Sequence, residues 1–520
     1  MRVVIAAVCL SLILLSVNST SLFKSAGRSL ATTGAMRIWV DYEDSDKQWL
    51  GDALKDKYIF AKKIMERTKA YYSTVLIVKS PKTEYTWPDT SVSGTKTVKG
   101  RTVAYDLWTY FYVYNKDDTS FASASPAAYD SDTGRPIVGY LDVNLNALTV
   151  STAGLINSMG TFVHEFYHIL VFNAELFPRF RDASGVEIGV SNLVFDYATT
   201  IKTTTRKAYK GTNVLEFART FLNFPALTGV VLENDGGAGS AGSHWEHMYW
   251  STEYMSPIDT VPSTLSELSL SMALDSGWFN INKDYIEPLE YGKNAGADIQ
   301  TDTCPTYQIP GFCNTIDEKS CSPDWRFKTK CYTDSTFSET CKFKFAEVAC
   351  SVPDGKYGAN VDSAIDNLGD TSRCLVTTVS GTASPRCAKA VCTGTTSITY
   401  TYAGGKTCTC SANGAAASCS DAAYSATCPA SISGFCERMT SANKCPGDCS
   451  GRGLCLGVNG SKRCFCVYGW KGDDCNTANA DETDAKLGTQ TGSQSGSTKN
   501  QSKMMLLVTI MISLIAALLQ

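Results

Sequence analysis

The sequence predicts an α+β fold for residues 35–300 and disulfide-rich modules after them. Cysteine placement supports this division, because Cys9 lies in an apolar N-terminal run and the other 20 of the 21 cysteines fall between Cys304 and Cys475. Upstream of these, segments rich in β-branched and aromatic residues occur together with helical patterns. A cysteine-free half must be held by a hydrophobic core, so we expect it to fold as a separate unit.

The expected elements of the first unit follow in chain order. A strand is expected at 37–42, and apolar residues from Trp49 to Met65 then recur at three- and four-residue spacing, which predicts a helix. The segments 72–80, 104–115 and 135–146 are rich in β-branched and aromatic residues and predict strands. A long helix with the pattern H-E-x-x-H follows them, so we expect a sheet that backs one long helix.

Overall composition narrows the functional classes. The chain has 520 residues, 43% hydrophobic and 19% charged, which is enough for two to four domains with a sizeable core. Its net charge of -4 is small for this length. Nucleic acid and anionic membrane surfaces are therefore not expected as partners.

The first residues have the pattern of a secretory signal peptide. Arg2 precedes an apolar run at 3–17, and small residues follow, so residues 1–20 are expected to direct export. The alternative, an N-terminal membrane anchor, needs a longer apolar run. Dense cysteines agree with an oxidising compartment, and the sequons at Asn459 and Asn500 permit glycosylation there.

The last residues have the pattern of a membrane-attachment signal. The apolar tail at 504–520 follows a polar stretch at 477–503 that contains small residues at 491–493. This order is typical of a glycosylphosphatidylinositol attachment signal. A short transmembrane helix is the alternative, although no basic cytoplasmic segment follows it. We expect a protein attached to the outer cell surface, with 477–503 as a flexible stalk.

The cysteine-rich part divides in two. Residues 301–440 hold 14 cysteines at irregular spacing, from which no pairing can be deduced. Residues 441–476 hold six with the spacing C-x3-C-x5-C-x8-C-x-C-x8-C, which resembles an epidermal-growth-factor (EGF)-like module. The resemblance implies the pairs Cys445–Cys455, Cys449–Cys464 and Cys466–Cys475.

The segment "VHEFYH" carries the chemistry. On a helix His164 and His168 lie on one face, one turn apart, and can direct both imidazoles at one cation such as Zn²⁺. Glu165 cannot easily reach the same ion, but it can deprotonate a zinc-bound water and pass the proton to a leaving amine. Two ordinary histidines on so apolar a helix would leave buried polar groups unpaired.

A zinc site needs a third protein ligand, for which the sequence offers three candidates. Glu187 fits the spacing H-E-x-x-H-x18-E of another zinc-peptidase class, but nearby glycines disfavour the helix that it needs. Glu175 would lie too far along a continued helix. His244 follows a glycine-rich stretch at 236–242 that lets the backbone turn tightly, and all four histidines lie in or near these two segments.

Together, "VHEFYH", "GSHWE" and "EYMSP", with "GRPIVGYLDVNL" upstream, resemble the leishmanolysin family of metzincin zinc endopeptidases. The resemblance covers residues 35–300, and less closely the region to 440. It implies a metzincin-like catalytic domain, a twisted sheet plus an active-site helix, that hydrolyses extended polypeptides. It also implies these roles: His164, His168 and His244 as zinc ligands, Glu165 as general base, Met255 in the Met-turn, and the strand at 136–142 as the sheet edge that binds substrate.

The sequence departs from the family in three ways. Val171 stands where the family has the glycine that ends the active-site helix, so we expect the helix to end near Phe172 or Asn173, with Asn173 in the left-handed turn. No cysteine that could cap the zinc stands between the leader and Arg37. The cysteines that family members often carry in the catalytic half are also missing.

Two alternative functions remain open. One is a catalytically inactive cell-surface adhesion or binding protein built on the same fold, although such descendants usually lose the glutamate or a histidine. The other is the peptidase class that uses Glu187. His247 is expected to be a partly exposed histidine rather than a further ligand, and Tyr249 and Tyr254 are expected to pack rather than to donate to an oxyanion.

Overall fold

The computed structural model describes residues 34–487 apart from short internal segments. These segments are 95, 118–119, 198–205, 259–263, 290, 298–310, 335, 338–340, 352–360, 370, 440–444, 458–461 and 485–486. The expected signal peptide at 1–20 and the apolar tail at 504–520 lie outside the described residues. Within the described residues, no helix combines the length and apolarity that a membrane span requires.

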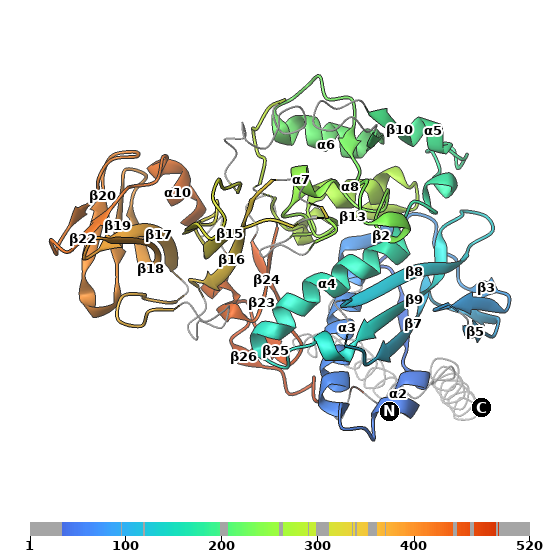
Figure 1. Cartoon of the computed structure of the whole chain (residues 1–520). Helices are drawn as coiled ribbons and strands as arrows, with labels where there is room; N and C mark the ends of the chain where they lie inside the picture. Colours follow the sequence, from blue (N-terminus) through green and yellow to red (C-terminus); the bar gives the residue numbers. More distant parts are fainter. Residues whose placement is uncertain are drawn as a thin grey trace, which may run out of the picture.

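A four-stranded sheet forms the lower lobe of the cysteine-free region (Figure 1). Its order is β1 (Ile38–Asp41), β7 (Leu107–Tyr114), β9 (Pro136–Asn144) and β8 (Ala122–Tyr129). The first three strands are parallel, and β8 joins the edge antiparallel to β9. Helices α3 (Lys55–Val75) and α4 (Thr152–Leu170) pack together and cover one face, and the short α2 (Glu43–Trp49) follows β1.

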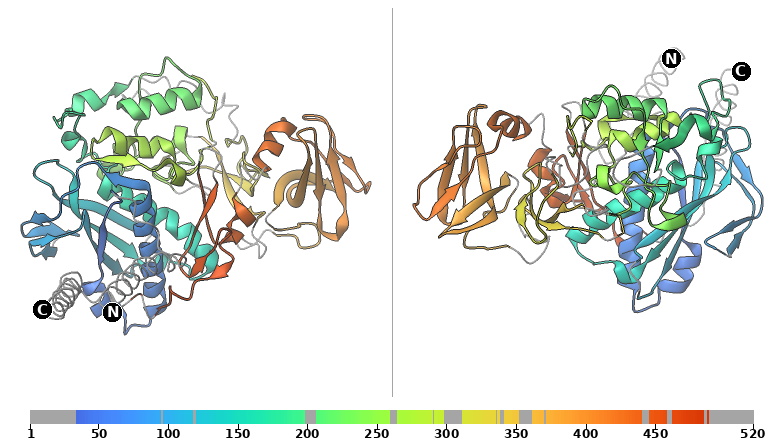
Figure 2. Two further views of the ribbon diagram at one scale, coloured as in Figure 1. Left: turned by 180° about the vertical axis from the view of Figure 1, so that it is seen from behind. Right: turned by 45° about the horizontal axis from the view of Figure 1, so that its top comes forward.

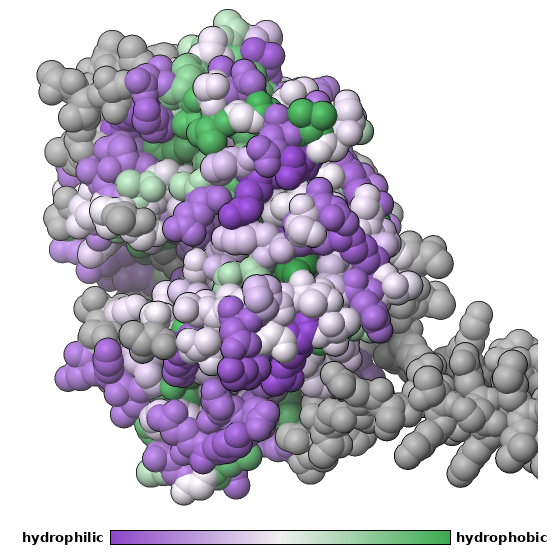
Figure 3. All heavy atoms as spheres, turned by 90° about the vertical axis from the view of Figure 1, so that its right-hand side faces the viewer, coloured by the Kyte–Doolittle hydropathy of each residue, from purple (hydrophilic) through white to green (hydrophobic). Residues whose placement is uncertain are grey.

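Alternation along β7 explains why both faces of this sheet are covered. Leu107, Phe111 and Val113 belong to the core beneath the helices, whereas Trp108 and Tyr110 belong to a second, aromatic cluster on the other face. Two small hairpins cover that cluster. They are β3 (Tyr85–Trp87) with β6 (Arg101–Val103), and β4 (Thr90–Val92) with β5 (Lys96–Val98). The face that carries them is mainly hydrophilic, with separate hydrophobic patches (Figure 3).

The upper lobe follows α4 in the chain. It contains α5 (Val190–Leu193), α6 (Thr212–Leu222), α7 (His247–Trp250) and α8 (Glu267–Asp275). A small sheet has the order β10 (Val194–Tyr197), β11 (Arg206–Tyr209) and β12 (Val230–Val231). The lobe ends where β13 (Phe279–Ile281) pairs with β2 (Leu76–Val78), directly after α3, so the chain returns to the lower lobe.

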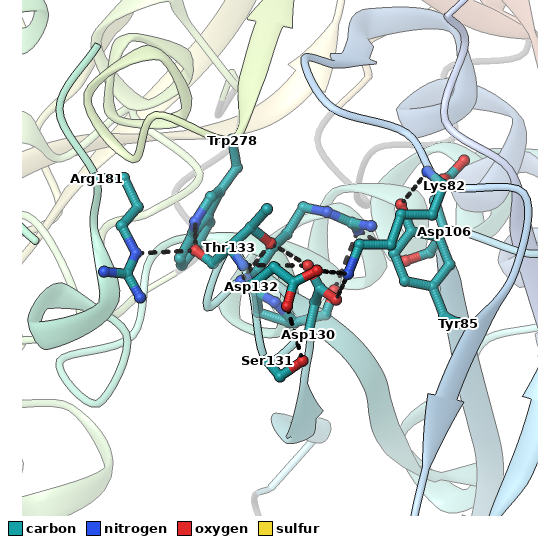
Figure 4. A network of polar contacts seen from close by, with 11 residues as sticks. Lys82, Tyr85, Asp106, Asp130, Ser131, Asp132, Thr133, Arg181 and Trp278 are labelled. Atoms are coloured by element: carbon teal, nitrogen blue, oxygen red, sulfur yellow. Dashed lines mark hydrogen bonds and ion pairs between the residues drawn. The ribbon is translucent and has the colours of Figure 1, made fainter. Parts of the chain in front are cut away.

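The loop between β8 and β9 joins the two lobes (Figure 4). The Thr133 carbonyl accepts hydrogen bonds from Arg181 Nε at 3.2 Å and from Trp278 Nε1 at 2.9 Å, both in the upper lobe. Lys82 is paired with Asp130 and Asp132 on the same loop. A cavity of about 420 Å³ lies at this junction, and its lining includes no histidine. It is therefore separate from the site described below.

The described part of the cysteine-rich region consists mainly of β-strands, with one α-helix near its end. A three-stranded sheet has the order β14 (Lys319–Cys321), β15 (Phe327–Tyr332) and β16 (Phe343–Ala349). A six-stranded sheet and α10 (Ile432–Met439) follow it. The strand order is β21 (Ser418–Cys419), β20 (Thr407–Cys410), β19 (Ser397–Thr401), β18 (Thr382–Thr393), β17 (Ser372–Val379) and β22 (Tyr424–Ala426).

Disulfides staple this region and the module after it. Six pairs between described cysteines lie before residue 440, among them Cys321–Cys374, which joins β14 to β17, and Cys392–Cys436, which joins β18 to α10. The three pairs implied for the EGF-like module are confirmed. The module consists of two hairpins, β23 (Gly453–Leu456) with β24 (Arg463–Cys466) and β25 (Trp470–Lys471) with β26 (Thr477–Ala478).

Three sequence-based expectations for the elements need correction. The segment 72–80 is not one strand, because α3 continues through Val75 and only Leu76–Val78 are extended. Strand β8 was not expected, since its Ala- and Ser-rich sequence carries little β propensity and is held by pairing with β9. The stalk expected from residue 477 instead packs on α3 as far as Asp484, through ion pairs of Glu482 and Asp484.

Candidate metal centre

Helix α4 supplies two of the candidate ligands. Its apolar residues, among them Phe162, Phe166 and Ile169, are fully buried, so the helix is fixed between the two lobes. Gly160, one turn before His164, costs helix stability, but a Cβ there would lie 2.6 Å from the Tyr254 ring. The glycine therefore lets the segment around Tyr254 approach the helix closely.

The loop before α7 brings the third histidine to the same point. Gly236, Gly237 and Gly242 all have positive φ, which only glycine adopts without strain. The Nε2 atom of His168 lies 3.0 Å from that of His164 and 3.1 Å from that of His244, and the remaining separation is 3.1 Å. A tetrahedral zinc site with ordinary Zn–N bonds separates its nitrogens by about 3.3 Å, so the three fit one such ion.

The other ring nitrogen of each histidine meets a carbonyl oxygen. His164 Nδ1 donates to Tyr254 O, His168 Nδ1 to Phe172 O at 2.6 Å, and His244 Nδ1 to Ser240 O at 3.0 Å. Because a carbonyl can only accept, each Nδ1 carries the proton and each neutral ring presents an Nε2 lone pair. Three lone pairs that face one another repel unless a cation lies between them. The donor set thus fits a divalent metal.

Burial keeps these rings neutral. It lowers the pKa of His164 to about 4 and, together with the charge of its neighbour His164, that of His168 to about 3. Burial also lowers the pKa of His244 well below its usual value. All three rings are therefore free of a second proton at neutral pH, which is the form that binds a metal.

Glu165 lies beside this cluster and faces the edge of the sheet. Burial raises the pKa of its carboxyl to about 8, partly offset by a hydrogen bond from the Ala124 backbone on β8. The contact identifies β8 as the strand beside the candidate centre. The expectation that 136–142 is the sheet edge was wrong, because β9 lies between β7 and β8. Local sequence shows that a segment is extended, but not which neighbours it pairs with.

The two carboxylates proposed as alternative ligands lie elsewhere. Glu187 is exposed and forms an ion pair with Arg181 at 3.1 Å in a short turn. Glu175 is exposed in the loop after α4. Among the described residues, the group at this point that could hold an ion consists of His164, His168 and His244 alone.

The end of α4 differs from the expectation. The helix ends at Leu170, and neither Val171 nor Asn173 is among the residues with positive φ, so no left-handed residue ends it. Instead the Asn173 amide donates to Val171 O at 3.0 Å, a tight turn centred on Phe172. This turn presents the Phe172 carbonyl to His168. Val171 is fully buried, so side-chain packing rather than a glycine stabilises the end of the helix.

Met255 is fully buried, in a turn held by Glu253. The Glu253 carboxylate accepts from Met255 N at 3.0 Å and from Ser266 N and Oγ at 2.9 and 2.7 Å. Tyr254, between the two, supplies the carbonyl that orients His164. Sequence reasoning did not single out Glu253, although its position two residues before the methionine was visible.

His247 is buried, so the expectation of a partly exposed ring was wrong. Its Nδ1 lies 2.6 Å from Ser256 Oγ, and its ring packs against Phe343 of the cysteine-rich region at 4.8 Å. His247 therefore links the α7 segment to the turn after Met255 and to the next region, and it is not one of the clustered histidines. Tyr249 is fully buried and Tyr254 nearly so, consistent with packing.

Comparisons with known proteins agree with this geometry. The leishmanolysin family profile matches residues 90–343, and a teneurin-like EGF domain profile matches residues 445–478. A leishmanolysin-like peptidase of Caenorhabditis elegans is 28% identical over 208 residues, covering 35% of this chain and 31% of the relative. A ciliated left-right organizer metallopeptidase of Mus musculus is 29% identical over 241 residues, covering 44% and 33%.

A leishmanolysin-like peptidase of Drosophila melanogaster is 23% identical over 256 residues, covering 42% of this chain and 37% of the relative. The chain thus spans about a third of the length of the curated relatives it matches. The disulfides between described cysteines and the EGF-like module are typical of secreted or cell-surface proteins. The chain therefore contains a domain of the leishmanolysin metallopeptidase family at residues 90–343, which includes the clustered histidines, and an EGF-like module at residues 445–478.

Proposed function

We propose that this chain is a zinc metalloendopeptidase of the cell surface that hydrolyses extended polypeptides. The observation that carries the proposal is the convergence of three neutral Nε2 lone pairs beside a carboxyl group. His164, His168 and His244 would hold the zinc, and Met255 would form the floor beneath them. When bound, zinc would polarise the scissile carbonyl and acidify the attacking water.

Glu165 would act as the general base. Its position next to His164 suits it to orient the attacking water, take its proton and pass that proton to the leaving amine. A nearby positive charge would lower the raised pKa of this carboxyl and favour the ionised form that a base requires. The outer edge of β8, from Ala122 to Tyr129, would bind the substrate as an added strand, since no strand in the described part of the chain pairs with that side.

Export and membrane attachment complete the proposal. The signal peptide at 1–20 would direct the chain into the secretory pathway, and the tail at 504–520 would be exchanged for a lipid anchor. Release of the protein from intact cells by a phosphatidylinositol-specific phospholipase would support the anchor. Retention after that treatment, with extraction by detergent alone, would support the short transmembrane helix instead.

The deciding experiment compares secreted protein lacking the apolar tail with matched variants. We expect one zinc per chain and hydrolysis of casein. Glu165→Gln should keep the zinc and lose activity by a factor of about 10²–10⁴, the usual contribution of a general base. Glu187→Gln makes the same chemical change at an exposed position and should leave both the zinc content and the activity unchanged. His244→Ala should lose the zinc.

Three results would count against the proposal. Wild-type protein without zinc, or full activity in Glu165→Gln, would refute the peptidase mechanism. Zinc that persists in His244→Ala but is lost in Glu187→Gln would identify the other ligand set. Wild-type protein that binds zinc yet hydrolyses no polypeptide would favour the alternative, a catalytically inactive adhesion or binding protein on the same fold.

A further inference from the structure

Only the main chain links the EGF-like module covalently to the regions before it. Its three disulfides, Cys445–Cys455, Cys449–Cys464 and Cys466–Cys475, all close within the module. Nothing covalent other than the backbone therefore fixes its position. Even so, the chain returns from the cysteine-rich region and places this module beside α3 and α4, as two views show (Figures 1 and 2).

Apolar residues of the β23–β24 hairpin enter the catalytic core. Leu456 is fully buried and Leu454 is 8% exposed, and both belong to the same hydrophobic cluster as the residues of α3 and α4. Phe465 packs against that cluster and meets the Tyr71 ring of α3 edge-on at 5.8 Å. Burying apolar side chains is favourable, so these contacts stabilise the docked position of the module.

Polar contacts surround this apolar centre. The Gly457 amide donates to Ile286 O at 2.8 Å, and Arg463 reaches Asp284 and the Tyr285 hydroxyl, each at 3.3 Å. These three partners follow β13 at the end of the upper lobe, whereas Tyr71 lies on α3. The module therefore contacts two segments of the catalytic region that are more than 200 residues apart in sequence.

The segment after the module continues the contact along α3. Glu482 accepts from Arg67 at 2.5 Å and from the Gly469 amide of the module at 2.9 Å. The two side chains of this ion pair are 17% and 23% exposed, so water screens them only in part. Asp484 pairs with Lys63, one turn earlier on α3, at 2.7 Å. Glu482 thus ties the module and its own segment to one helix.

Helix α3 leads directly to the candidate metal centre. Tyr72, next to Tyr71, donates its hydroxyl hydrogen bond to Val163 O at 2.6 Å, and Val163 precedes His164. The Tyr72 ring also stacks on Phe166 at 5.4 Å. The residues that the module contacts therefore belong to the helix that supports the metal-binding helix from behind.

We propose that the EGF-like module and residues 476–487 form an intramolecular brace of the catalytic region. The partner of the module's β23–β24 face is this chain's own helix α3 and the segment 284–286, not an external protein. The catalytic unit accordingly comprises residues 35–291 together with 445–487, and a catalytic fragment that ends before the cysteine-rich region lacks part of its core.

Cleavage between the module and the cysteine-rich region tests the brace. A protease site is placed at residues 440–444 of the secreted chain, between α10 and the first cysteine of the module, and the cut protein is passed through a size-exclusion column at about 1 μM. Because no disulfide crosses the cut, the module stays with the rest only if it is docked. We expect wild-type module to co-elute and the protein to keep its thermal unfolding temperature. Free module in the wild-type chain would overturn the proposal.

Charge variants make the test specific to the contact. Glu482→Arg places like charges at a partly buried site and should weaken retention by a factor of about 30 or more. The double variant Glu482→Arg with Arg67→Glu restores the pair and should recover most of the retention. Asp473→Arg makes the same charge change at an exposed position of the module and should co-elute as wild type does. Equal release of the module by Asp473→Arg and Glu482→Arg would refute the contact.

Discussion

Restoring the family glycine at the end of α4 should destabilise this protein. Where leishmanolysin-type sequences place glycine, Val171 is fully buried, and its φ is not in the left-handed region. A glycine there would relieve no backbone strain. It would instead remove a packed side chain and loosen the turn whose Phe172 carbonyl orients His168. The substitution Val171→Gly therefore tests whether this position needs the backbone freedom of glycine or a packed side chain.

The expected size of the effect follows from burial and backbone entropy. Losing a fully buried valine side chain costs about 1.5–3 kcal/mol. Glycine adds roughly 0.5–1 kcal/mol because it gains more freedom in the unfolded chain. We therefore expect Val171→Gly to lower the free energy of unfolding by about 2–4 kcal/mol, a large share of the total for an ordinary domain.

Urea unfolding of the secreted protein, followed by tryptophan fluorescence, measures this change. Val186→Gly is the matched control, since Val186 is 60% exposed and its replacement should cost less than about 1 kcal/mol. Metal affinity measured by chelator competition should fall in Val171→Gly and not in the control. Unchanged or increased stability of Val171→Gly would show that the helix end tolerates glycine and that the packing argument is wrong.

Three further results are expected. Burial and the nearby Glu253 raise the pKa of Glu287 to about 8, so the contribution of this carboxyl to stability declines as pH rises from about 5 to 8. The difference in unfolding free energy between wild type and Glu287→Gln should therefore change by about 2–3 kcal/mol over that range in urea titrations, and a difference that does not change with pH would contradict it. Gly139→Ala should lower both the metal affinity and the unfolding temperature, because a Cβ at this position would lie 2.2 Å from an Ile169 methyl group on α4. If the variant keeps the metal affinity and unfolding temperature of wild type, α4 can shift freely to make room. Tyr72→Phe should cost about 1 kcal/mol in thermal unfolding, and no loss would mean that its bond to the α4 backbone adds nothing.

Much of the candidate site was accessible from local pattern. The spacing of His164 and His168 is one helical turn, and the structure places both side chains at one point. The EGF-like cysteine spacing correctly implied its three pairs. The end of α4 was predicted only approximately, because the sequence shows that glycine is absent but not that a buried valine and a tight turn at Phe172 replace it.

Other features depended on contacts between distant segments. The burial of His247 depends on Phe343, almost a hundred residues away, so its own neighbours in sequence gave the wrong expectation. Likewise, β8 forms the sheet edge because it pairs with β9 on one side only, although its sequence has little β character. Which strands pair, and which distant side chains meet, depends on the complementarity of whole surfaces, and sequence periodicity carries no information about that complementarity.

Sequence alone was enough to predict the division into a cysteine-free and a cysteine-rich half and the histidine pair on one helix, and the resemblance to EGF-like modules implied the pairing within the last module. These rest on short-range geometry, namely helical periodicity and motif spacing. For the third ligand, spacing left Glu175, Glu187 and His244 open and the family resemblance implied His244; the tertiary structure brings His244 to the other two histidines, and it alone shows that the module packs on α3. Both depend on chain segments that are far apart in sequence and meet only because folding buries their apolar surfaces together.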